Sequence, residues 1–331
     1  ASATDMYNVA VGHQAGTAMT TGIYNTIVGG LAGDALTIGN QNTALGMLAL
    51  SASVDGDSNT AVGFSALRDY EDGDGNGNNT AVGSNSQVAA TTGEFNTSVG
   101  SLSQGVGVLT GDGNTSVGYQ AGQAITSGSG NIAIGRGCGD AVTSGSDNIS
   151  IGTSALGTED EHGKNVAIGS SALNALNAGA DGYNVAVGYT AGAAMTTGVH
   201  NTVLGASAGL SITDAIRNTL VGSVAGDALT TGNYNTALGW GALTASVDGD
   251  KNTAIGYLTL AVYEDGSTNG YNTAVGSESQ AAASTGEFNT SLGGLSMGVG
   301  VTTGDYNVAV GYRAGEKISS TTTATLIGAF A

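Results

Sequence analysis

Proline is absent from this chain of 331 residues, and cysteine occurs once, at Cys138. Proline cannot donate a backbone hydrogen bond, so its absence is typical of strands in which every N–H pairs with a neighbour. A single cysteine excludes disulfide bonds within the chain. We interpret Cys138 as a small buried residue, because it stands at a repeated position that otherwise holds mostly alanine.

Basic residues are also scarce. Seven lysines and arginines stand against 26 aspartates and glutamates, which gives a formal net charge of −19. Such a surface repels nucleic acid and anionic membranes, because both bind proteins through Lys and Arg. No segment approaches the roughly 18 consecutive apolar residues that a membrane-spanning helix needs. We therefore expect no nucleic-acid partner and no membrane insertion, and we interpret the acidity as a source of solubility.

A short repeat fills the chain instead. Eighteen times the sequence places Asn, a β-branched residue, a residue that is mostly Ala or Ser, an aliphatic residue and then Gly. Most copies lie 17 residues apart, and the β-branched residue is Thr in twelve of them. A fixed period this short indicates stacked units and not a compact enzyme domain. Representative Asn and Gly positions are Asn8 and Gly12, Asn25 and Gly29, Asn201 and Gly205, and Asn307 and Gly311.

The repeat predicts an all-β parallel β-roll, or β-solenoid, of about 19 coils. Side chains alternate along a strand, so the β-branched and aliphatic residues share one face and the small residue takes the other. The unbroken Gly suggests a positive φ angle or a place too tight for a Cβ atom. Asn tolerates the left-handed region and bonds its own backbone, which favours a turn corner. We expect two short strands and two tight turns per coil.

A second, longer period is visible. The segment 33–46 returns at 226–239 and the segment 92–108 returns at 285–301, an offset of 193 residues. We predict one continuous solenoid over 1–331 that contains a tandem duplication, about 25–217 and 218–331, with the second copy incomplete. Residues 323–331 keep the strand pattern and Gly328 but place Ala324 where Asn belongs, so we interpret them as a degenerate last coil.

Each coil offers little apolar surface for burial. The hydrophobic gain from one aliphatic and a few small side chains barely offsets the entropy lost by ordering the coil. We therefore expect further burial between chains. Ala and Ser let backbones approach closely, so the small position of the strand is our candidate for this contact.

The run Asn-Thr-Ala-Val-Gly, followed by Ala and Gly, resembles the coils of trimeric autotransporter adhesin heads, the YadA-like head family. It is also similar to Asn-Thr-rich repeats of phage tail fibres. The resemblance covers the chain from Asn8 to Gly328. It implies a left-handed parallel β-roll, a homotrimer, and a role in display or attachment. The period of 17 residues is longer than is usual in that family.

These observations predict a structural or attachment fibre shaft, extracellular or on a virion surface. A viral tail-fibre segment that displays or forms a host-receptor-binding surface is our first interpretation. A bacterial trimeric adhesin head and a self-assembling extracellular filament are the alternatives. The partners we expect are further copies of the chain and a cell-surface receptor or glycan.

Ten of the twelve tyrosines lie at two positions that flank the predicted strand, one before the Asn and one after the Gly. Aromatic side chains on turns can stack on sugars or anchor a protein partner. They can equally pack against one another or between chains, and both interpretations stay open. The candidates for receptor contact are Tyr119, Tyr189, Trp240, Tyr257 and Tyr312.

Acidic residues gather in one of the longer loops. Asp72, Asp74 and Asn76 match the opening of a calcium-binding loop, and Asp55 and Asp57 lie one coil earlier. The Glu expected at the twelfth position of such a loop is absent, because Gly83 stands there. Calcium binding and a solvated acidic loop are the two interpretations; we expect no other cofactor.

We expect no enzymatic activity. The three histidines have no Ser or Cys partner in a repeated setting, and the acidic segment 158–163 is interpreted as a single exposed loop. Paired carboxylates across coils, as in glycosidases, remain an alternative. An ice-binding face would need an exposed threonine array. Because the threonines share a strand face with the aliphatic residues, we expect them to point inward or into a subunit contact.

Overall fold

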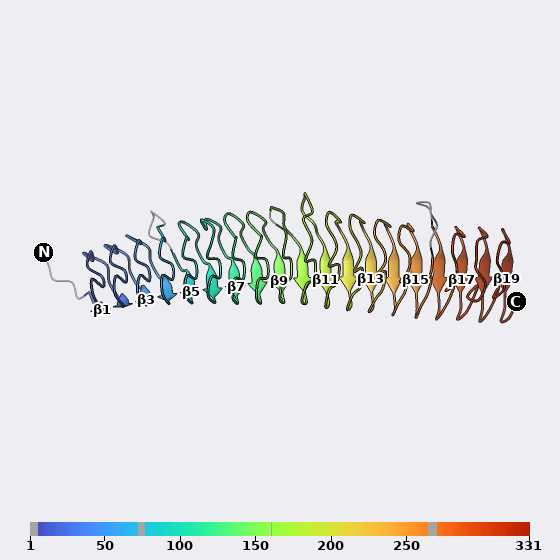
Figure 1. Cartoon of the computed structure of the whole chain (residues 1–331), viewed down its shortest axis with the longest axis horizontal. Helices are drawn as coiled ribbons and strands as arrows, with labels where there is room; N and C mark the ends of the chain where they lie inside the picture. Colours follow the sequence, from blue (N-terminus) through green and yellow to red (C-terminus); the bar gives the residue numbers. More distant parts are fainter. Residues whose placement is uncertain (1–5, 72–76, 160, 264–269) are drawn as a thin grey trace. The chain divides into compact units, whose positions relative to one another are not determined.

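The computed structural model describes residues 6–71, 77–159, 161–263 and 270–331, and these residues form strands and turns but no helix. They belong to two compact units, 1–164 and 165–331. Within each unit the strands follow one another in sequence order and run parallel (Figure 1). The predicted all-β parallel β-solenoid is confirmed, whereas its continuity over the whole chain stays a prediction.

Every strand is three residues long. The strands of the first unit are β1 (Val9–Val11), β2 (Thr26–Val28), β3 (Thr43–Leu45), β4 (Thr60–Val62), β5 (Thr80–Val82), β6 (Thr97–Val99), β7 (Thr115–Val117), β8 (Ile132–Ile134) and β9 (Ile149–Ile151). Those of the second unit are β10 (Val166–Ile168), β11 (Val185–Val187), β12 (Thr202–Leu204), β13 (Thr219–Val221), β14 (Thr236–Leu238), β15 (Thr253–Ile255), β16 (Thr273–Val275), β17 (Thr290–Leu292), β18 (Val308–Val310) and β19 (Thr325–Ile327).

Neighbouring strands pair residue for residue. Thr43 lies opposite Thr60, and Thr60 lies opposite Thr80 although three extra residues separate this second pair along the chain. Insertions are therefore absorbed in the turns, and equivalent residues of successive coils stack in columns. Below, positions in a coil are counted from its Asn, which is position 0, so the strand occupies positions +1 to +3.

In the described residues each coil contains one strand, so the prediction of two strands per coil is wrong. Residues at positions −1, +6 and +8 have positive φ angles, as at Tyr24 (62°), Leu48 (60°) and Leu50 (54°). A strand cannot contain such residues, and the second half of the coil therefore runs as successive turns. Its backbone still bonds to the next coil, for example from the N–H of Leu50 to the carbonyl of Ala66 at 3.0 Å.

The Asn at position 0 connects adjacent coils. The Oδ1 atom of Asn218 accepts the backbone N–H of Asn235 at 2.8 Å, and its Nδ2 atom donates to the carbonyl of Gly232 at 2.9 Å. Asn218 is buried, and the same pattern recurs along both units. The predicted turn role of Asn is wrong, because the left-handed residue is the one before it. Its side chain instead satisfies backbone groups of the next coil, which burial would otherwise leave unpaired.

The Gly at position +4 has both a positive φ angle and too little space for a Cβ atom, the two conditions that the sequence predicted. Gly205 has a φ of +140°, and a Cβ atom on it would lie 2.5 Å from the carbonyl oxygen of Gly222 in the next coil. A side chain is excluded there by both backbone strain and contact with main-chain atoms.

The interior is lined by positions +2 and +7, which are mostly small, and by positions +8 and +11. The middle strand residue, such as Ala44 or Ser98, is fully buried inside the coil. The expectation that this small column forms a contact between chains is therefore wrong. The larger middle residues Ile27, Val203 and Leu220 are also fully buried, and each belongs to a coil with Gly at position +8, which leaves room for the larger side chain.

Positions +8 and +11 exchange volume along the interior. Wherever position +8 is Gly, position +11 is a large aliphatic residue: Met19, Leu36, Ile125, Val142, Met195, Ile212, Leu229 and Ile318. Where position +8 is Leu, position +11 is often small or polar, as in the pair Leu243 and Ser246, both buried. Tyr70 and Tyr263 also occupy position +11, and both are fully buried. The Gly–aliphatic and Leu–Ser pairs are thus alternate arrangements of similar volume, whereas the Leu–Tyr pairs fill more of the core.

Candidate functional site

The outward face of the strands carries the β-branched and aliphatic residues. Along β2 to β18, positions +1 and +3 are exposed or half-buried while position +2 is buried. Leu45 is 48% exposed and Leu238 47% exposed, although both belong to strands. The expectation that the threonines point inward is therefore wrong for the single chain, since the middle strand residue is the one that faces the interior. We call positions +1 and +3 of all strands the outer strand face.

Threonine fills position +1 of six consecutive coils in each unit. The two arrays are Thr26, Thr43, Thr60, Thr80, Thr97 and Thr115, and Thr202, Thr219, Thr236, Thr253, Thr273 and Thr290. None of these twelve hydroxyls forms a hydrogen bond within the described part of the chain. A second threonine ladder at position +12 differs, because its hydroxyls donate to the next coil, as Thr230 does to the carbonyl of Val247 at 3.0 Å. Of these two threonine ladders, the one on the outer strand face leaves its hydroxyls available to a partner or to solvent.

Aromatic residues frame this face, and those at position −1 stack along the coils. Ring centroids of Tyr271 and Phe288 are 5.0 Å apart, those of Phe288 and Tyr306 are 4.9 Å apart, and Tyr7 stacks on Tyr24. The interplanar angles of these pairs do not exceed 9°. Ring faces inside a stack are covered by their neighbours, so the ring edges and the hydroxyl groups point to solvent.

Basic side chains join the same column. The guanidinium of Arg217 donates to the hydroxyl of Tyr234 at 2.7 Å, and Nζ of Lys251 lies 4.7 Å from the ring centroid of Tyr271. A hydrogen bond with Tyr271 raises the pKa of Lys251. His200 stacks on Tyr183 with a centroid distance of 5.2 Å. Aromatic and basic groups of this column therefore contact one another in three groups: Tyr183 with His200, Arg217 with Tyr234, and Lys251 with the stack of Tyr271, Phe288 and Tyr306.

The five predicted receptor-contact residues all lie at position +5, on the other edge of the outer strand face. Tyr119, Tyr189, Trp240, Tyr257 and Tyr312 are each about half exposed. Only Trp240 and Tyr257 are brought together, with ring centroids 5.3 Å apart, while Tyr312 meets Phe330 edge-on. They form no common cluster, and receptor contact stays a prediction.

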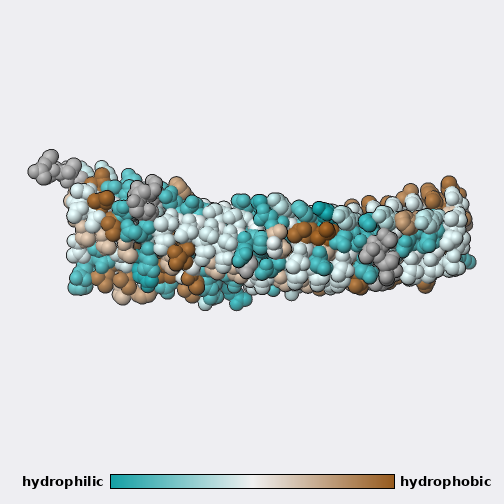
Figure 2. All heavy atoms as spheres, turned by 90° about the horizontal axis from the view of Figure 1, so that it is seen from above, coloured by the Kyte–Doolittle hydropathy of each residue, from teal (hydrophilic) through white to brown (hydrophobic). Residues whose placement is uncertain are grey.

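Hydrophobic residues are spread over the surface. In the view of Figure 2 they form several separate patches among polar residues and not one continuous area.

The predicted calcium residues are described only in part. Asp72, Asp74 and Asn76 lie outside the described residues. Asp57 accepts the backbone N–H of Asn40 at 2.6 Å, a bond that links two coils, and Asp55 is half-buried. Within the described segments, no group of three or more His, Cys, Asp and Glu residues is placed to hold a metal ion. Calcium binding by the longer loop stays a prediction.

The interpretation of 158–163 as an exposed loop is wrong for Glu159, which is fully buried. It stands at position +11, an inward position. Its Oε1 atom accepts the backbone N–H of His162 at 3.2 Å and lies 3.6 Å from Nδ1 of the same residue. The period of the repeat was the signal that could have located this side chain.

Cys138 is buried, as predicted. Its Sγ atom donates to the carbonyl of Gly135 at 3.2 Å, and burial raises the pKa of the thiol to about 11. The thiol is therefore neutral and poorly nucleophilic near pH 7.

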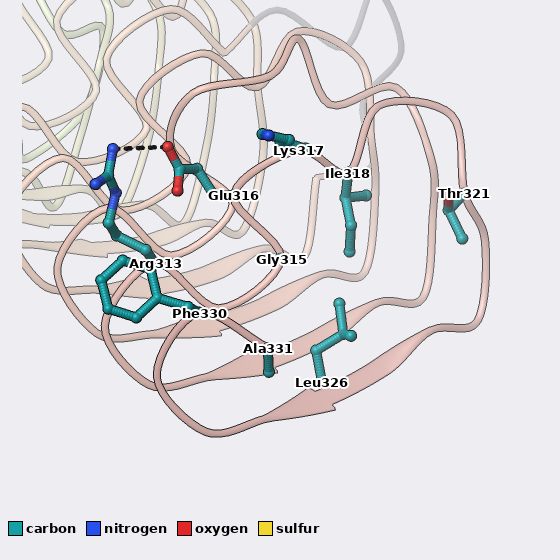
Figure 3. Close-up of a pocket in the computed structure, with 9 residues that line it drawn as sticks. All are labelled: Arg313, Gly315, Glu316, Lys317, Ile318, Thr321, Leu326, Phe330 and Ala331. Atoms are coloured by element: carbon teal, nitrogen blue, oxygen red, sulfur yellow. Dashed lines mark hydrogen bonds and ion pairs between the residues drawn. The ribbon is translucent and has the colours of Figure 1, made fainter.

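A pocket of about 450 Å³ lies in the last coil of the second unit (Figure 3). Ile318 and Leu326 point into it, and Arg313 pairs with Glu316 at 2.8 Å on its rim. Both apolar side chains belong to inward columns, so the pocket is the end of the solenoid interior. No helix in the described segments has the length and apolar character to cross a membrane.

No protein-family model matches the chain, and no curated protein sequence matches it.

Proposed function

We propose that the chain is the shaft of a fibre, extracellular or on a virion surface, whose chains associate through the outer strand face. The supporting observation is the aliphatic column at position +3, which is outward in every coil from β2 to β18 and uncovered in the single chain. A repeated apolar surface of this kind is typical of an interaction site. A second copy has the same spacing between coils, so its column can match this one along its length.

The number of chains and the hand of the coils follow the resemblance to adhesin heads and tail fibres. On that basis the proposed assembly is a homotrimer of left-handed β-rolls. The first assignment is a viral tail-fibre segment that displays or forms a host-receptor-binding surface. A bacterial trimeric adhesin head and a self-assembling extracellular filament are the alternatives, because the same fold suits each.

Introducing charge on the outer strand face tests the association. The double variant Leu238→Lys and Ile255→Lys places two charges in the proposed interface and is expected to yield folded monomers in light scattering. The control is Ile38→Lys, which adds charge at a residue that is 50% exposed but outside the strands. Unchanged assembly in the double variant contradicts the proposal.

Immunogold electron microscopy on the native source tests the assignment. Antibody label on the tails or surfaces of virus particles supports the tail-fibre role. Label on cell surfaces or on free filaments contradicts it and leaves an adhesin or a filament.

One observation favours a second function on the same face, the ordering of water at an ice surface. The unbonded threonine hydroxyls repeat about every 4.7–4.9 Å across the strands, beside a column of aliphatic groups about 6.6 Å further along the strand. Thermal hysteresis of a monomeric chain, lost in Thr236→Tyr and kept in Thr230→Tyr, supports this function. A trimer without thermal hysteresis excludes it, because one face cannot both bind ice and be buried between chains.

A further inference from the structure

Position −1 of the second unit is occupied by an aromatic or basic residue in eight consecutive coils: Tyr183, His200, Arg217, Tyr234, Lys251, Tyr271, Phe288 and Tyr306. We call this column the ridge. In a chain with only seven lysines and arginines, two of them stand here.

The duplication supplies an internal comparison for the ridge. The residues 193 positions before Tyr234, Lys251, Tyr271 and Tyr306 are Gln41, Ser58, Asn78 and Gly113. These first-copy residues have positive φ angles like their counterparts, 66° at Gly113 and 58° at Tyr306. Glycine is the most favourable residue for such a backbone, and the coil closes in the same way with it. Folding therefore does not require the aromatic side chains of the second copy.

Stacking of the rings determines which atoms of the ridge a ligand can contact. Phe288 is covered on both faces, by Tyr271 at 5.0 Å and Tyr306 at 4.9 Å. These rings are nevertheless 37–58% exposed, through their edges and hydroxyls. The ridge presents tyrosine hydroxyls together with the donors of Arg217 and Lys251, at a spacing of one coil. It thus offers a row of hydrogen-bond donors and polarised ring edges, and its closed ring faces are unavailable for stacking.

A row that repeats the same groups at a fixed spacing suits a ligand that is itself a linear polymer with a similar repeat. An extended 1,4-linked polysaccharide advances by about the rise of one coil per sugar and carries acceptor oxygens on every residue. Nucleic acid is disfavoured, because the chain has a net charge of −19. Asp250 and Asp305, which bond the backbone N–H groups of Asn233 and Glu287, place negative charge beside the ridge and disfavour a densely anionic glycan.

We propose that the ridge binds a linear 1,4-linked polysaccharide laid along the stack of coils, with one sugar per coil. The inference names the ligand class for the attachment part of the proposed function and rests on it.

The test replaces ridge residues with those of the first copy, in the combined variant Tyr234→Gln, Lys251→Ser, Tyr271→Asn and Tyr306→Gly. Each substitution is found at the same position of a coil that folds. The control is Tyr7→Ser with Tyr24→Ser, which removes two exposed tyrosines at position −1 of the first unit, outside the ridge. Titration calorimetry measures binding of a β-1,4-linked glucose hexamer, the corresponding dimer, and a β-1,4-linked uronate hexamer.

The parent chain is expected to bind the glucose hexamer at least tenfold more tightly than a dimer of the same linkage. The ridge variant is expected to lose at least tenfold in affinity, while the control keeps it. Equal or weaker binding of the uronate hexamer supports a neutral chain, and a preference for the uronate hexamer that disappears at high salt contradicts the charge argument from Asp250 and Asp305.

The proposal is overturned if neither hexamer binds, if affinity does not depend on chain length, or if the ridge variant binds like the parent. Retention of a cell-surface protein by the ridge, without oligosaccharide binding, also overturns it. Light scattering on the same samples shows whether the chains form trimers, and it therefore distinguishes a failure of the ridge proposal from a failure of the proposed shaft. Trimers that do not bind glycans contradict only the ridge, and monomers that bind them contradict only the shaft.

Discussion

Gly209 lacks a side chain where Ile212, three residues later, fills the interior of the coil. A Cβ atom on Gly209 would lie 2.7 Å from the Cδ1 atom of Ile212. Leu243 and Ser246 occupy the same two positions in another coil of the same unit, with the large residue first. The pair exchanges volume, so the total that fills the core is retained.

The pair predicts a compensating double substitution. Gly209→Leu overpacks the core and is expected to destabilise the chain by about 1–3 kcal/mol. Ile212→Ser leaves a cavity and is expected to cost about 3 kcal/mol. Together they reproduce the arrangement of Leu243 and Ser246, so the double variant is expected to be more stable than the sum of the two losses predicts. Urea unfolding of the four proteins measures the coupling, and strictly additive losses contradict volume exchange.

The column of Asn residues at position 0 predicts that the substitution of Asn by Asp lowers stability by different amounts in two coils. In Asn218→Asp the donor to the carbonyl of Gly232 is replaced by a carboxylate oxygen, so a buried acceptor loses its partner. We expect a loss of about 2–4 kcal/mol.

Asn252 is the matched control for that substitution. Its Nδ2 atom is buried and has no hydrogen-bond partner among the described residues, while its Oδ1 atom accepts the N–H of Asn272 at 3.1 Å. Asn252→Asp therefore removes no hydrogen bond seen between described residues and should be the less damaging change in thermal unfolding. Equal losses at the two positions argue against the donor role of the Asn amide.

Glycine at position +4 is expected to be irreplaceable. Gly205→Ala places a Cβ atom against the carbonyl of Gly222 at a φ of +140°, and we expect a loss of about 3 kcal/mol. Gly30→Ala is the control, because a Cβ atom there has no neighbour within 4 Å. Denaturant titration should show a change within about 0.5 kcal/mol for Gly30→Ala. A tolerated alanine at Gly205 would contradict the account of this column.

Cys138 predicts a loss of stability at alkaline pH. Its folded-state pKa is about 11, above the ordinary value of 9.0. The neutral thiol therefore makes its full contribution to the free energy of unfolding below pH 9. This contribution is lost as the pH rises through 11, by up to about 2 kcal/mol. Unfolding free energies at pH 8 and pH 11 measure the loss, and Cys138→Ala should lack it. In the native protein near pH 7 the thiol should react slowly with a disulfide reagent; rapid labelling would show that the thiol is not buried.

The periodic features of the fold were predictable because each follows from one repeated residue type. Asn25 and Gly29 place the ends of a strand, and the β-branched residue between them predicts the strand itself. The period also places insertions in turns, which the pairing of Thr60 with Thr80 confirms.

Directions and partners of side chains were harder to predict, because they depend on the width of the coil. Alternation shows that Thr43 and Leu45 share a face but not that this face is outward. In the structure the middle residue, such as Ala44, is the one that is buried, and Leu45 is exposed. The left-handed backbone of Leu50, which prevents a second strand, has no signal in a leucine side chain. The exchange between positions +8 and +11 was visible in the sequence once the coils were aligned.

The sequence predicted at which positions of the coil the candidate site residues lie, but not which side chains they contact. Trp240 and Tyr257 were predicted only as residues that follow the Gly of the repeat, and the structure stacks them at 5.3 Å. The covered ring faces of Tyr271 and Phe288 could not be inferred, since they depend on side-chain orientation above a left-handed residue. The buried Glu159 was missed because its acidic neighbours suggested an exposed loop.

The molar mass of the purified chain in solution, measured by light scattering across a dilution series, tests the central claim most directly. An outer strand face that joins three chains predicts a mass of three times 32.0 kDa that persists on dilution. A folded and stable monomer of 32.0 kDa would contradict the shaft, because the aliphatic column of the strands would then face water in the native state.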